Sequence, residues 1–337
     1  MPTILDVAKR AGVSKTLVSR LLNSRKGVSE ASKEAILAAI KDLNYRPNHL
    51  ARSLVLQRTY TIGVVMDSLC TPFYFDFICG LEDAGRRHGY NTLFCSANEQ
   101  EAVKSRYIEF FTQGRTDGII IYGSSLGDSD LIRGLSETHF PFVVVEHDIQ
   151  GALMNRVLLD NIQGAKTATE HLISLGAKDI RHFMGDLNKK ISLDRCTGFL
   201  EAMRAHGLQA GNNSIVNSRF TEKSGYECMK GLIEKKDIPE AIFFSGDVTA
   251  FGAMRAMIEN GIRIPEDVRL VGFDEDTPGS FDLVFPALTT MKQPLHEMAE
   301  KAVQILVETI ENPGGECKTK VFQPELLVKA TCGASKI

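Results

Sequence analysis

The sequence predicts an α/β protein in which three short helices over residues 1–46 precede two lobes of parallel, doubly wound β-sheet over residues 60–337. Two observations predict this arrangement. The first part shows apolar residues at helical spacing, interrupted by a glycine. The second part alternates short apolar runs with amphipathic stretches, which is typical of parallel sheets covered by helices on both faces. A chain of 337 residues is also long for one hydrophobic core, so more than one domain is expected.

The composition is that of an ordinary soluble globular protein, with 43% hydrophobic and 24% charged residues. No stretch approaches the roughly 18 uninterrupted apolar residues of a membrane span. Asp6, Lys9 and Arg10 stand where a signal peptide needs an apolar run, so we expect a cytoplasmic protein. The seven cysteines form no CxxC pair and their number is odd, which favours reduced thiols and no bound metal.

The charge is distributed unevenly along the chain. Residues 1–60 hold eleven Lys/Arg and four Asp/Glu, a net charge of +7, whereas the remaining residues carry −10. A basic head on an acidic body indicates either a polyanionic partner at one end or a solvated tail. The pattern of the head decides between them.

The first predicted helix begins after Thr3, whose hydroxyl is suited to cap it, and carries Asp6 in its first turn. Its apolar residues, from Ile4 to Ala11, fall on one face. Gly12 ends the helix, because glycine adopts the left-handed conformation at no steric cost.

Ser14 is suited to cap a second helix, which runs through residues 15–23. Two short helices joined by a tight glycine turn form a helix-turn-helix unit, whose second helix enters the major groove of DNA with its N-terminal residues. A third helix over residues 29–43 completes a three-helix core. A helical bundle without a role in DNA binding is the alternative, but it would not need the excess of positive charge. The candidate DNA contacts here are Ser14, Lys15, Thr16, Ser19, Arg20 and Asn23.

Residues 47–59 are predicted to form a hinge helix and a linker. Pro47 fits the first turn of a short helix over residues 48–54, which is basic and too short to be stable alone. This segment is either a plain linker or a helix that folds on DNA, with an apolar residue inserted between base pairs in the minor groove. The candidate DNA contacts here are Asn48, His49 and Leu54.

Eight apolar runs predict the strands of the second part, because a strand buried on both faces reads as a continuous apolar run. Eight runs are many for one sheet, so we expect two lobes that divide near residue 161. A further strand pattern covers residues 321–331. The predicted strands are 61–66, 91–97, 118–123, 142–146, 156–160, 179–185, 241–245 and 268–274, and the predicted helices are 74–88, 100–113, 161–175, 193–207, 222–235, 247–261 and 294–311.

Polar and aromatic residues follow these strands, where an α/β sheet binds its ligand. Carboxylates, an arginine and aromatic rings suit a polyhydroxylated ligand, because acceptors and a forked donor bind hydroxyls while rings stack on the apolar face of a sugar. Each residue alone has an ordinary alternative, since Asp247 is also placed to cap a helix and Phe73 and Phe220 also suit a core. The set comprises Asp67, Phe73, Tyr74, Tyr122, Glu146, Asp160, Arg195, Phe220, Asp247 and Asp274.

Two segments, ILDVAKRAGVSKTLVSRLLN and VSEASKEAILAAIKDLNYRPNHLARSL, resemble the lac/galactose repressor (LacI/GalR) family. The resemblance continues through DNIQGAKTATEHLISLG, SLDRCTGF, SGDVTAFGAMRAMIENGIRIPEDVRLVGFDE and LTTMKQP, and so covers nearly the whole chain. It implies a two-lobed domain like that of periplasmic binding proteins. It also implies base contacts by Lys15, Thr16 and Arg20 and a minor-groove lever at Leu54. The effector contacts that it implies are Phe73, Tyr74, Tyr122, Glu146, Arg195, Phe220, Asp247, Asp274 and Gln293.

Three residues depart from the family pattern. Leu17 stands where the family usually has a threonine that touches the DNA backbone. Gly246 replaces an asparagine before Asp247, and Ala177 replaces a histidine.

Other motifs are weaker. GSSLG (123–127) imitates a hydrolase nucleophile elbow centred on Ser125, but no spacing identifies its histidine and acid. DEDTPG (274–279) is no calcium loop, because Phe285 stands where a glutamate is required. There is no P-loop and no GxGxxG after the first strand. We therefore expect no enzymatic activity, no cofactor and no metal.

The sequence predicts a sequence-specific DNA-binding transcription regulator, a repressor, that reads a palindromic operator as a homodimer. A small-molecule effector, a sugar or sugar derivative, would control its operator affinity, as an inducer or as a corepressor. The alternative is a periplasmic-type sugar-binding protein without a DNA function. The basic helical head and the missing signal peptide argue against it.

Overall fold

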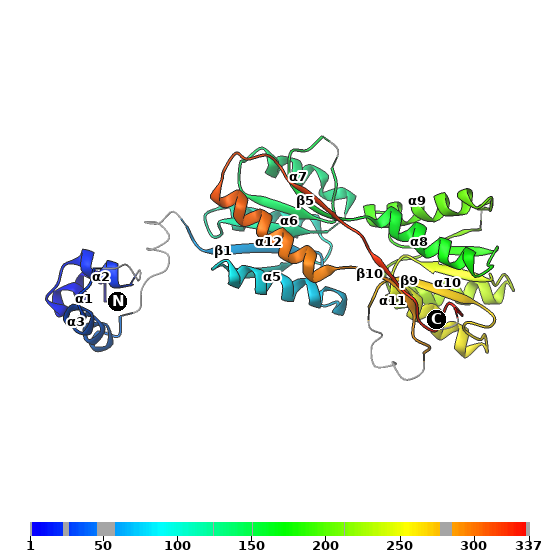
Figure 1. Cartoon of the computed structure of the whole chain (residues 1–337), viewed down its shortest axis with the longest axis horizontal. Helices are drawn as coiled ribbons and strands as arrows, with labels where there is room; N and C mark the ends of the chain where they lie inside the picture. Colours follow the sequence, from blue (N-terminus) through cyan, green and yellow to red (C-terminus); the bar gives the residue numbers. More distant parts are fainter. Residues whose placement is uncertain are drawn as a thin grey trace. The chain divides into compact units, whose positions relative to one another are not determined.

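The computed structural model describes residues 2–22, 27–45, 58–123, 125–149, 151–211, 213–276 and 285–334. The chain divides into two compact units, Met1–Thr59 and Tyr60–Ile337 (Figure 1). The predicted boundary between residues 46 and 47 falls outside the described residues, and so do the predicted hinge helix and Asn23. Among the residues that the structure describes, no helix has the length and apolar character needed to cross a membrane.

Three helices form the first unit. α1 (Ile4–Ala11) begins with a capping box, in which the N–H of Thr3 donates to Asp6 Oδ2 at 2.8 Å and the N–H of Asp6 donates to Thr3 Oγ1 at 3.4 Å. Gly12 then takes a left-handed φ of 65°. α2 (Lys15–Leu22) and α3 (Glu30–Asp42) follow. The predicted helix-turn-helix architecture is therefore confirmed. Its buried core consists of Val7, Ala8, Val18, Ile36 and Ala39.

The first lobe of the second unit is a six-stranded sheet in the order β11-β5-β4-β3-β1-β2. Its neighbouring strands pair in parallel. α5 and α12 cover one face, and α6 and α7 cover the other. The strands are β1 (Thr61–Met66), β2 (Asn91–Ser96), β3 (Gly118–Tyr122), β4 (Phe142–Val145), β5 (Asn155–Leu159) and β11 (Thr319–Phe322), and the helices are α5 (Phe75–Arg87), α6 (Glu101–Thr112), α7 (Ser129–Ser136) and α12 (Leu295–Glu311), with short 3-10 turns η1 (Pro72–Tyr74) and η2 (Leu126–Asp128).

The second lobe repeats this design, with the strand order β12-β10-β9-β8-β6-β7. Its strands pair in parallel except β12, which runs antiparallel to β10. α8 and α9 cover one face, and α10 and α11 cover the other. The strands are β6 (Ile180–Met184), β7 (Ile215–Asn217), β8 (Ala241–Phe244), β9 (Arg269–Asp274), β10 (Thr289–Lys292) and β12 (Glu325–Leu327), and the helices are α8 (Asn161–Ser174), α9 (Lys190–Ala205), α10 (Glu222–Glu234) and α11 (Asp247–Glu259).

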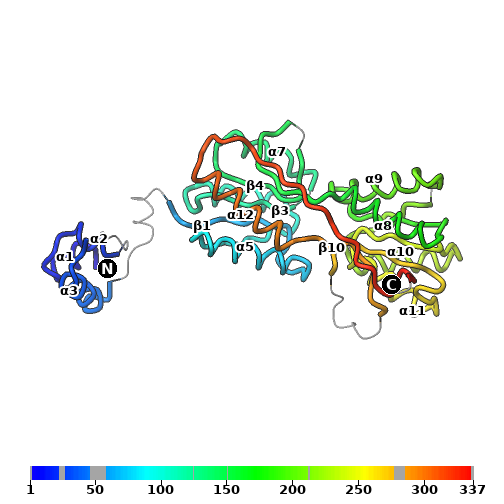
Figure 2. Tube along the Cα trace, viewed as in Figure 1, coloured from blue at the N-terminus to red at the C-terminus, as the bar shows by residue number. Residues whose placement is uncertain are grey.

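The two lobes are joined by more than one crossing of the chain. The predicted division near residue 161 marks the first crossing, between β5 and α8. α12 returns to pack on β3, β4 and β5, so the C-terminal part does not belong wholly to the second lobe. The predicted single strand over 321–331 is two strands, β11 in the first sheet and β12 in the second, and Figure 2 shows this last segment passing from one lobe to the other. Gln323 and Pro324 separate them.

Candidate functional site

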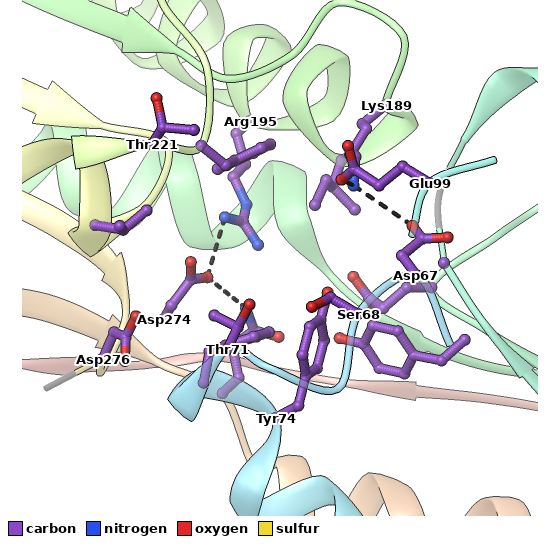
Figure 3. A pocket seen from close by; sticks show the side chains of 18 of the residues that line it. Asp67, Ser68, Thr71, Tyr74, Glu99, Lys189, Arg195, Thr221, Asp274 and Asp276 are labelled. Atoms are coloured by element: carbon purple, nitrogen blue, oxygen red, sulfur yellow. Dashed lines mark hydrogen bonds and ion pairs between the residues drawn. The ribbon is translucent and has the colours of Figure 1, made fainter. Parts of the chain in front are cut away.

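A cavity of about 370 Å³ lies between the two lobes, outside the carboxyl ends of several parallel strands. Asp67 follows β1, Glu146 follows β4, Asp274 ends β9, and Gln293 follows β10. This is the position that doubly wound sheets offer to a ligand. In Figure 3, Arg195 and Asp274 lie on one side of the cavity and Lys189, Glu99 and Asp67 on the other.

Eight of the nine predicted effector residues line this cavity, although they come from distant parts of the chain. The ninth, Asp247, is not among the lining residues. It is buried behind them, where its carboxylate accepts the Thr290 hydroxyl at 2.8 Å and the backbone N–H of Asp276 at 3.0 Å. Burial, with the Asp274 carboxylate nearby, raises the pKa of Asp247 well above its ordinary value. The eight that line the cavity are Phe73, Tyr74, Tyr122, Glu146, Arg195, Phe220, Asp274 and Gln293.

Arg195 and Asp274 form the polar centre of the cavity. Arg195 Nη1 donates to Asp274 Oδ1 at 3.1 Å, and its Nε donates to Asn161 Oδ1 at 2.8 Å. The guanidinium also lies 3.7 Å from the centre of the Phe273 ring, and only 1% of the residue is exposed. Such contacts hold a forked donor in one orientation before a ligand arrives.

Gln293 completes this centre and leaves one acceptor unused. Its Nε2 donates to Asp274 Oδ1 at 2.7 Å, while its buried Oε1 has no hydrogen-bond partner among the described residues. A buried polar atom without a partner costs free energy. A ligand that donates an O–H or N–H to Oε1 would form the hydrogen bond that this atom lacks in the free protein, which favours binding.

The carboxylates of the cavity are partly desolvated. Burial raises the pKa of Asp274 to about 6, against the opposing effects of Arg195 and Gln293. Burial also raises the pKa of Glu146, whose oxygens accept the N–H of Leu159 at 2.7 Å and the Asn161 amide at 3.1 Å. Acceptors in such surroundings form stronger hydrogen bonds with a ligand than they would in water.

Aromatic rings supply the apolar part of the wall. Tyr74 meets Phe73 and Tyr122 edge to face, with ring centres 5.0 and 5.2 Å apart. The Phe220 ring packs over Gly246, where an added Cβ would lie 2.9 Å from it and 3.1 Å from Asp274 Oδ2. The departure of Gly246 from the family pattern therefore has a steric reason, because a side chain there would displace Phe220 or Asp274.

Several lining residues were not among the sequence-predicted effector contacts. Asp67 appeared in the set of strand-end residues, but the family resemblance did not select it. Lys189 and Glu99 come from charged loop segments that read as solvated surface, and only the fold brings them to the cavity. The additional lining residues are Asp67, Ser68, Thr71, Glu99, Gly123, Lys189, Ile191, Thr221, Glu222, Val248 and Asp276.

In the first unit, α2 presents its predicted DNA-contacting residues to solvent. Ser14, Lys15, Thr16 and Arg20 are exposed, and Ser19 is half-buried. The Ser14 hydroxyl accepts the N–H of Leu17 at 3.2 Å and so caps the helix. Leu17 itself packs against the three-helix core, which gives a structural reason for an apolar residue at this position. Asn23, Asn48, His49 and Leu54 lie outside the described residues.

Two family models match the chain. The model of bacterial regulatory proteins of the lacI family matches residues 3–48, and the model of a periplasmic binding protein-like domain matches residues 169–332. The HTH-type transcriptional repressor PurR of Haemophilus influenzae (strain PittEE) is 35% identical over 335 residues, 98% of each chain. PurR of Photobacterium profundum is 33% identical over 332 residues, again 98% of each chain.

Solved structures share the architecture. A complex of the transcriptional regulator CelR with cellobiose has a TM-score of 0.73 at 27% identity, covering 98% of this chain and 100% of that one. The Lac repressor dimer bound to operator and the anti-inducer ONPF has a TM-score of 0.88 at 24% identity, covering 99% of both chains. The second likeness concerns the fold alone.

Proposed function

Because the chain belongs to the lacI family of bacterial regulatory proteins, we propose that the cavity between its lobes binds the small molecule that controls its operator affinity. As a member of this family the chain is a DNA-binding transcriptional repressor, and its curated relatives are named as repressors. The observation that carries the proposal is the preorganised group of Arg195, Asp274 and Gln293, in which Gln293 Oε1 has no hydrogen-bond partner among the described residues.

We propose a carbohydrate or a carbohydrate derivative as the first candidate effector. Sugar hydroxyls both donate and accept, which matches carboxylate and amide oxygens beside the Arg195 guanidinium. The rings of Phe73, Tyr74 and Phe220 offer an apolar surface for the face of a sugar. A relative of similar fold is known in complex with cellobiose, which supports this class.

The name of the curated relatives, PurR, favours a second candidate, a purine-related ligand. A flat heterocycle stacks on aromatic rings, and its ring N–H groups donate to carboxylate and amide oxygens. Both candidate ligands would donate hydrogen bonds to the same acceptors, Asp274 and Gln293. A binding experiment with members of each class distinguishes them.

On the DNA side, we propose that the exposed face of α2 reads base edges of a palindromic operator and that the protein acts as a cytoplasmic homodimer. Lys15, Thr16 and Arg20 would reach the bases of one half-site. Within the hinge and linker segment 47–59, the short helix over 48–54 would fold on DNA, with Asn48, His49 and Leu54 in contact. A transport-type sugar-binding protein without a DNA function is not favoured, because residues 3–48 match the regulatory family.

The direct test is a thermal-shift screen of the full chain with cellobiose and other neutral sugars, and with purine bases and nucleosides. A bound ligand raises the melting temperature by mass action, so the true effector class should stand out in a concentration-dependent way. The variant Asp274→Asn should show no such rise in melting temperature. If a ligand raised the melting temperature of Asp274→Asn as much as that of the wild type, the cavity would not be the effector site.

A further inference from the structure

The charged side chains of the cavity are strongly unbalanced. Among the described residues that line it, acidic side chains outnumber basic ones by six to two. A cavity built to hold a phosphate would show the reverse, because a phosphate dianion needs uncompensated cations or several N–H donors. The six acidic residues are Asp67, Glu99, Glu146, Glu222, Asp274 and Asp276, and the basic ones are Lys189 and Arg195.

Lys189 is neutralised by carboxylates of the other lobe. It lies just before α9 of the second lobe, and its Nζ is 2.6 Å from Glu99 Oε1 and 3.4 Å from Asp67 Oδ2. Glu99 and Asp67 both belong to the first lobe. The Lys189 side chain is 14% exposed and that of Asp67 is 4% exposed, so solvent screens this pair little, whereas the Glu99 side chain is 61% exposed.

A second lysine accounts for much of the charge of Asp67. Lys104 is buried beneath the cavity, and its Nζ donates to Asp67 Oδ1 at 2.7 Å and also to Asp128. Asp67 therefore divides its charge between two lysines. Glu99 is the closer partner of Lys189 and, among the described residues, it is not shared with a second lysine as Asp67 is.

Arg195 is also paired. Asp274 lies against its Nη1, and the carbonyl oxygen of Ser245 accepts from the same nitrogen. Among the described residues that line the cavity, neither basic side chain is left without a carboxylate within hydrogen-bonding distance.

From this arrangement we infer that the effector carries no phosphate or other anionic group, and that Glu99 is the residue that excludes such ligands by neutralising Lys189. A phosphate entering the cavity loses its hydration, meets unbalanced carboxylates, and must displace Glu99 to reach Lys189. A neutral sugar or a neutral purine-type ligand meets no such penalty. The inference rests on the proposed function in one respect, that this cavity is the effector site.

The test uses inorganic phosphate as the probe, with the full chain and no DNA. The wild type, Glu99→Gln and Glu222→Gln are titrated with phosphate, and sodium chloride of equal ionic strength is the reference for the thermal shift. Glu222 lines the same cavity but pairs with Arg255, so its substitution removes the same charge without freeing Lys189. Because the side chain of Glu99 is 61% exposed, Glu99→Gln should fold normally.

We expect Glu99→Gln to bind phosphate on the order of tenfold more tightly than the wild type, and Glu222→Gln to gain much less, because it removes one repelling carboxylate but leaves Lys189 paired with Glu99. The double variant Glu99→Gln/Lys189→Met should return to the wild-type response. Phosphate that binds to the basic first unit contributes equally to every variant, so it cancels when the variants are compared.

Two results would overturn the inference. In the first, the wild type binds phosphate and Lys189→Met abolishes that binding, so Lys189 is free to take an anion. In the second, Glu99→Gln gains nothing over Glu222→Gln, so Glu99 does not set the selectivity. Neither result depends on operator binding or on finding the natural effector, so failure here is distinguishable from failure of the proposed function.

Discussion

Asp274 combines the main electrostatic features of the cavity in one side chain. It accepts from Arg195 and Gln293, and burial raises its pKa to about 6. Its ionised form is an acceptor only, whereas its protonated form offers a donor and loses its pairing with Arg195. A ligand that donates O–H or N–H groups should therefore bind the ionised form.

This gives a pH dependence with a defined sign. Above pH 7 Asp274 is ionised and ligand affinity should be constant, and it should fall about tenfold between pH 7 and pH 5 as the carboxylate takes up a proton. Isothermal titration at several pH values measures this. Asp274→Asn is the control, since its affinity should be lower and should change less with pH than that of the wild type. An equal wild-type affinity at both pH values would show that Asp274 does not bind the ligand.

The burial of His182 should make the stability of the fold depend on pH. It is fully buried, its Nδ1 lies 3.1 Å from the carbonyl oxygen of Phe243, and burial lowers its pKa to about 3. The folded protein keeps His182 neutral while the unfolded chain protonates it below about pH 6.5. Its contribution to stability is therefore complete above pH 6.5 and is lost as the pH falls toward 3.

We expect His182 to account for a loss of about 2 kcal/mol in the free energy of unfolding between pH 7.5 and pH 5. Urea unfolding of the wild type and of His182→Gln at the two pH values measures it. The variant should be less stable at pH 7.5 but should lose less on acidification. Parallel pH profiles for the two proteins would rule out this role.

At the scale of elements, the segment before α9 joins the lobes. Leu126 donates its N–H to the carbonyl oxygen of Asn188 at 2.8 Å, and Ser125 and Lys189 form an antiparallel bridge. The ion pairs of Lys189 with Glu99 and Asp67 lie at the same contact. Among the described residues, the ion pair of Lys190 lies within its own helix, with Asp194 at 2.8 Å.

These two neighbouring lysines make a matched pair. Lys189→Met should loosen the contact between the lobes and speed amide hydrogen exchange of residues 125–128, whereas Lys190→Met should leave it unchanged. Hydrogen exchange of the two variants, measured by mass spectrometry on the ligand-free full chain, tests this difference. Equal exchange in both variants would mean that the backbone contacts alone hold the lobes together.

The exposed face of α2 predicts which substitutions weaken operator binding. Arg20→Ala should weaken binding to a selected operator roughly ten- to a hundredfold, the cost of losing a good base contact. Lys33→Ala removes an equal charge from α3, where Lys33 pairs with Glu30, and should weaken operator binding far less. Footprinting compares the two variants. Intact operator preference in Arg20→Ala would refute a base contact by this residue.

Which elements could be predicted follows from their local signals. Thr3, Asp6 and Gly12 define α1 through contacts within a few residues, and the caps and the turn appear in the structure. The return of α12 to the first lobe has no such signal, because its apolar face fits either sheet. The two last strands likewise read as one pattern, although Gln323 and Pro324 divide it between the lobes.

At the scale of the whole molecule, the cavity was predictable where strands end and unpredictable where loops meet. Glu146, Asp274 and Gln293 lie at or directly after strands, so the topology places them at one edge. Lys189 and Glu99 meet only because the lobes close on each other, and neither carries a periodic or capping signal. The pairing of charged side chains in the cavity therefore depends on the fold and not on any one segment.

The central claim is that ligand in this cavity controls operator affinity through residues far along the chain from the DNA-reading unit. The most direct measurement is anisotropy of a labelled operator titrated with the full chain, with and without the ligand found by thermal shift. We predict that ligand changes the operator Kd of the wild type, while Asp274→Asn keeps the ligand-free Kd and no longer responds at the same ligand concentration. An undiminished response in Asp274→Asn, or no response in the wild type, would contradict the claim.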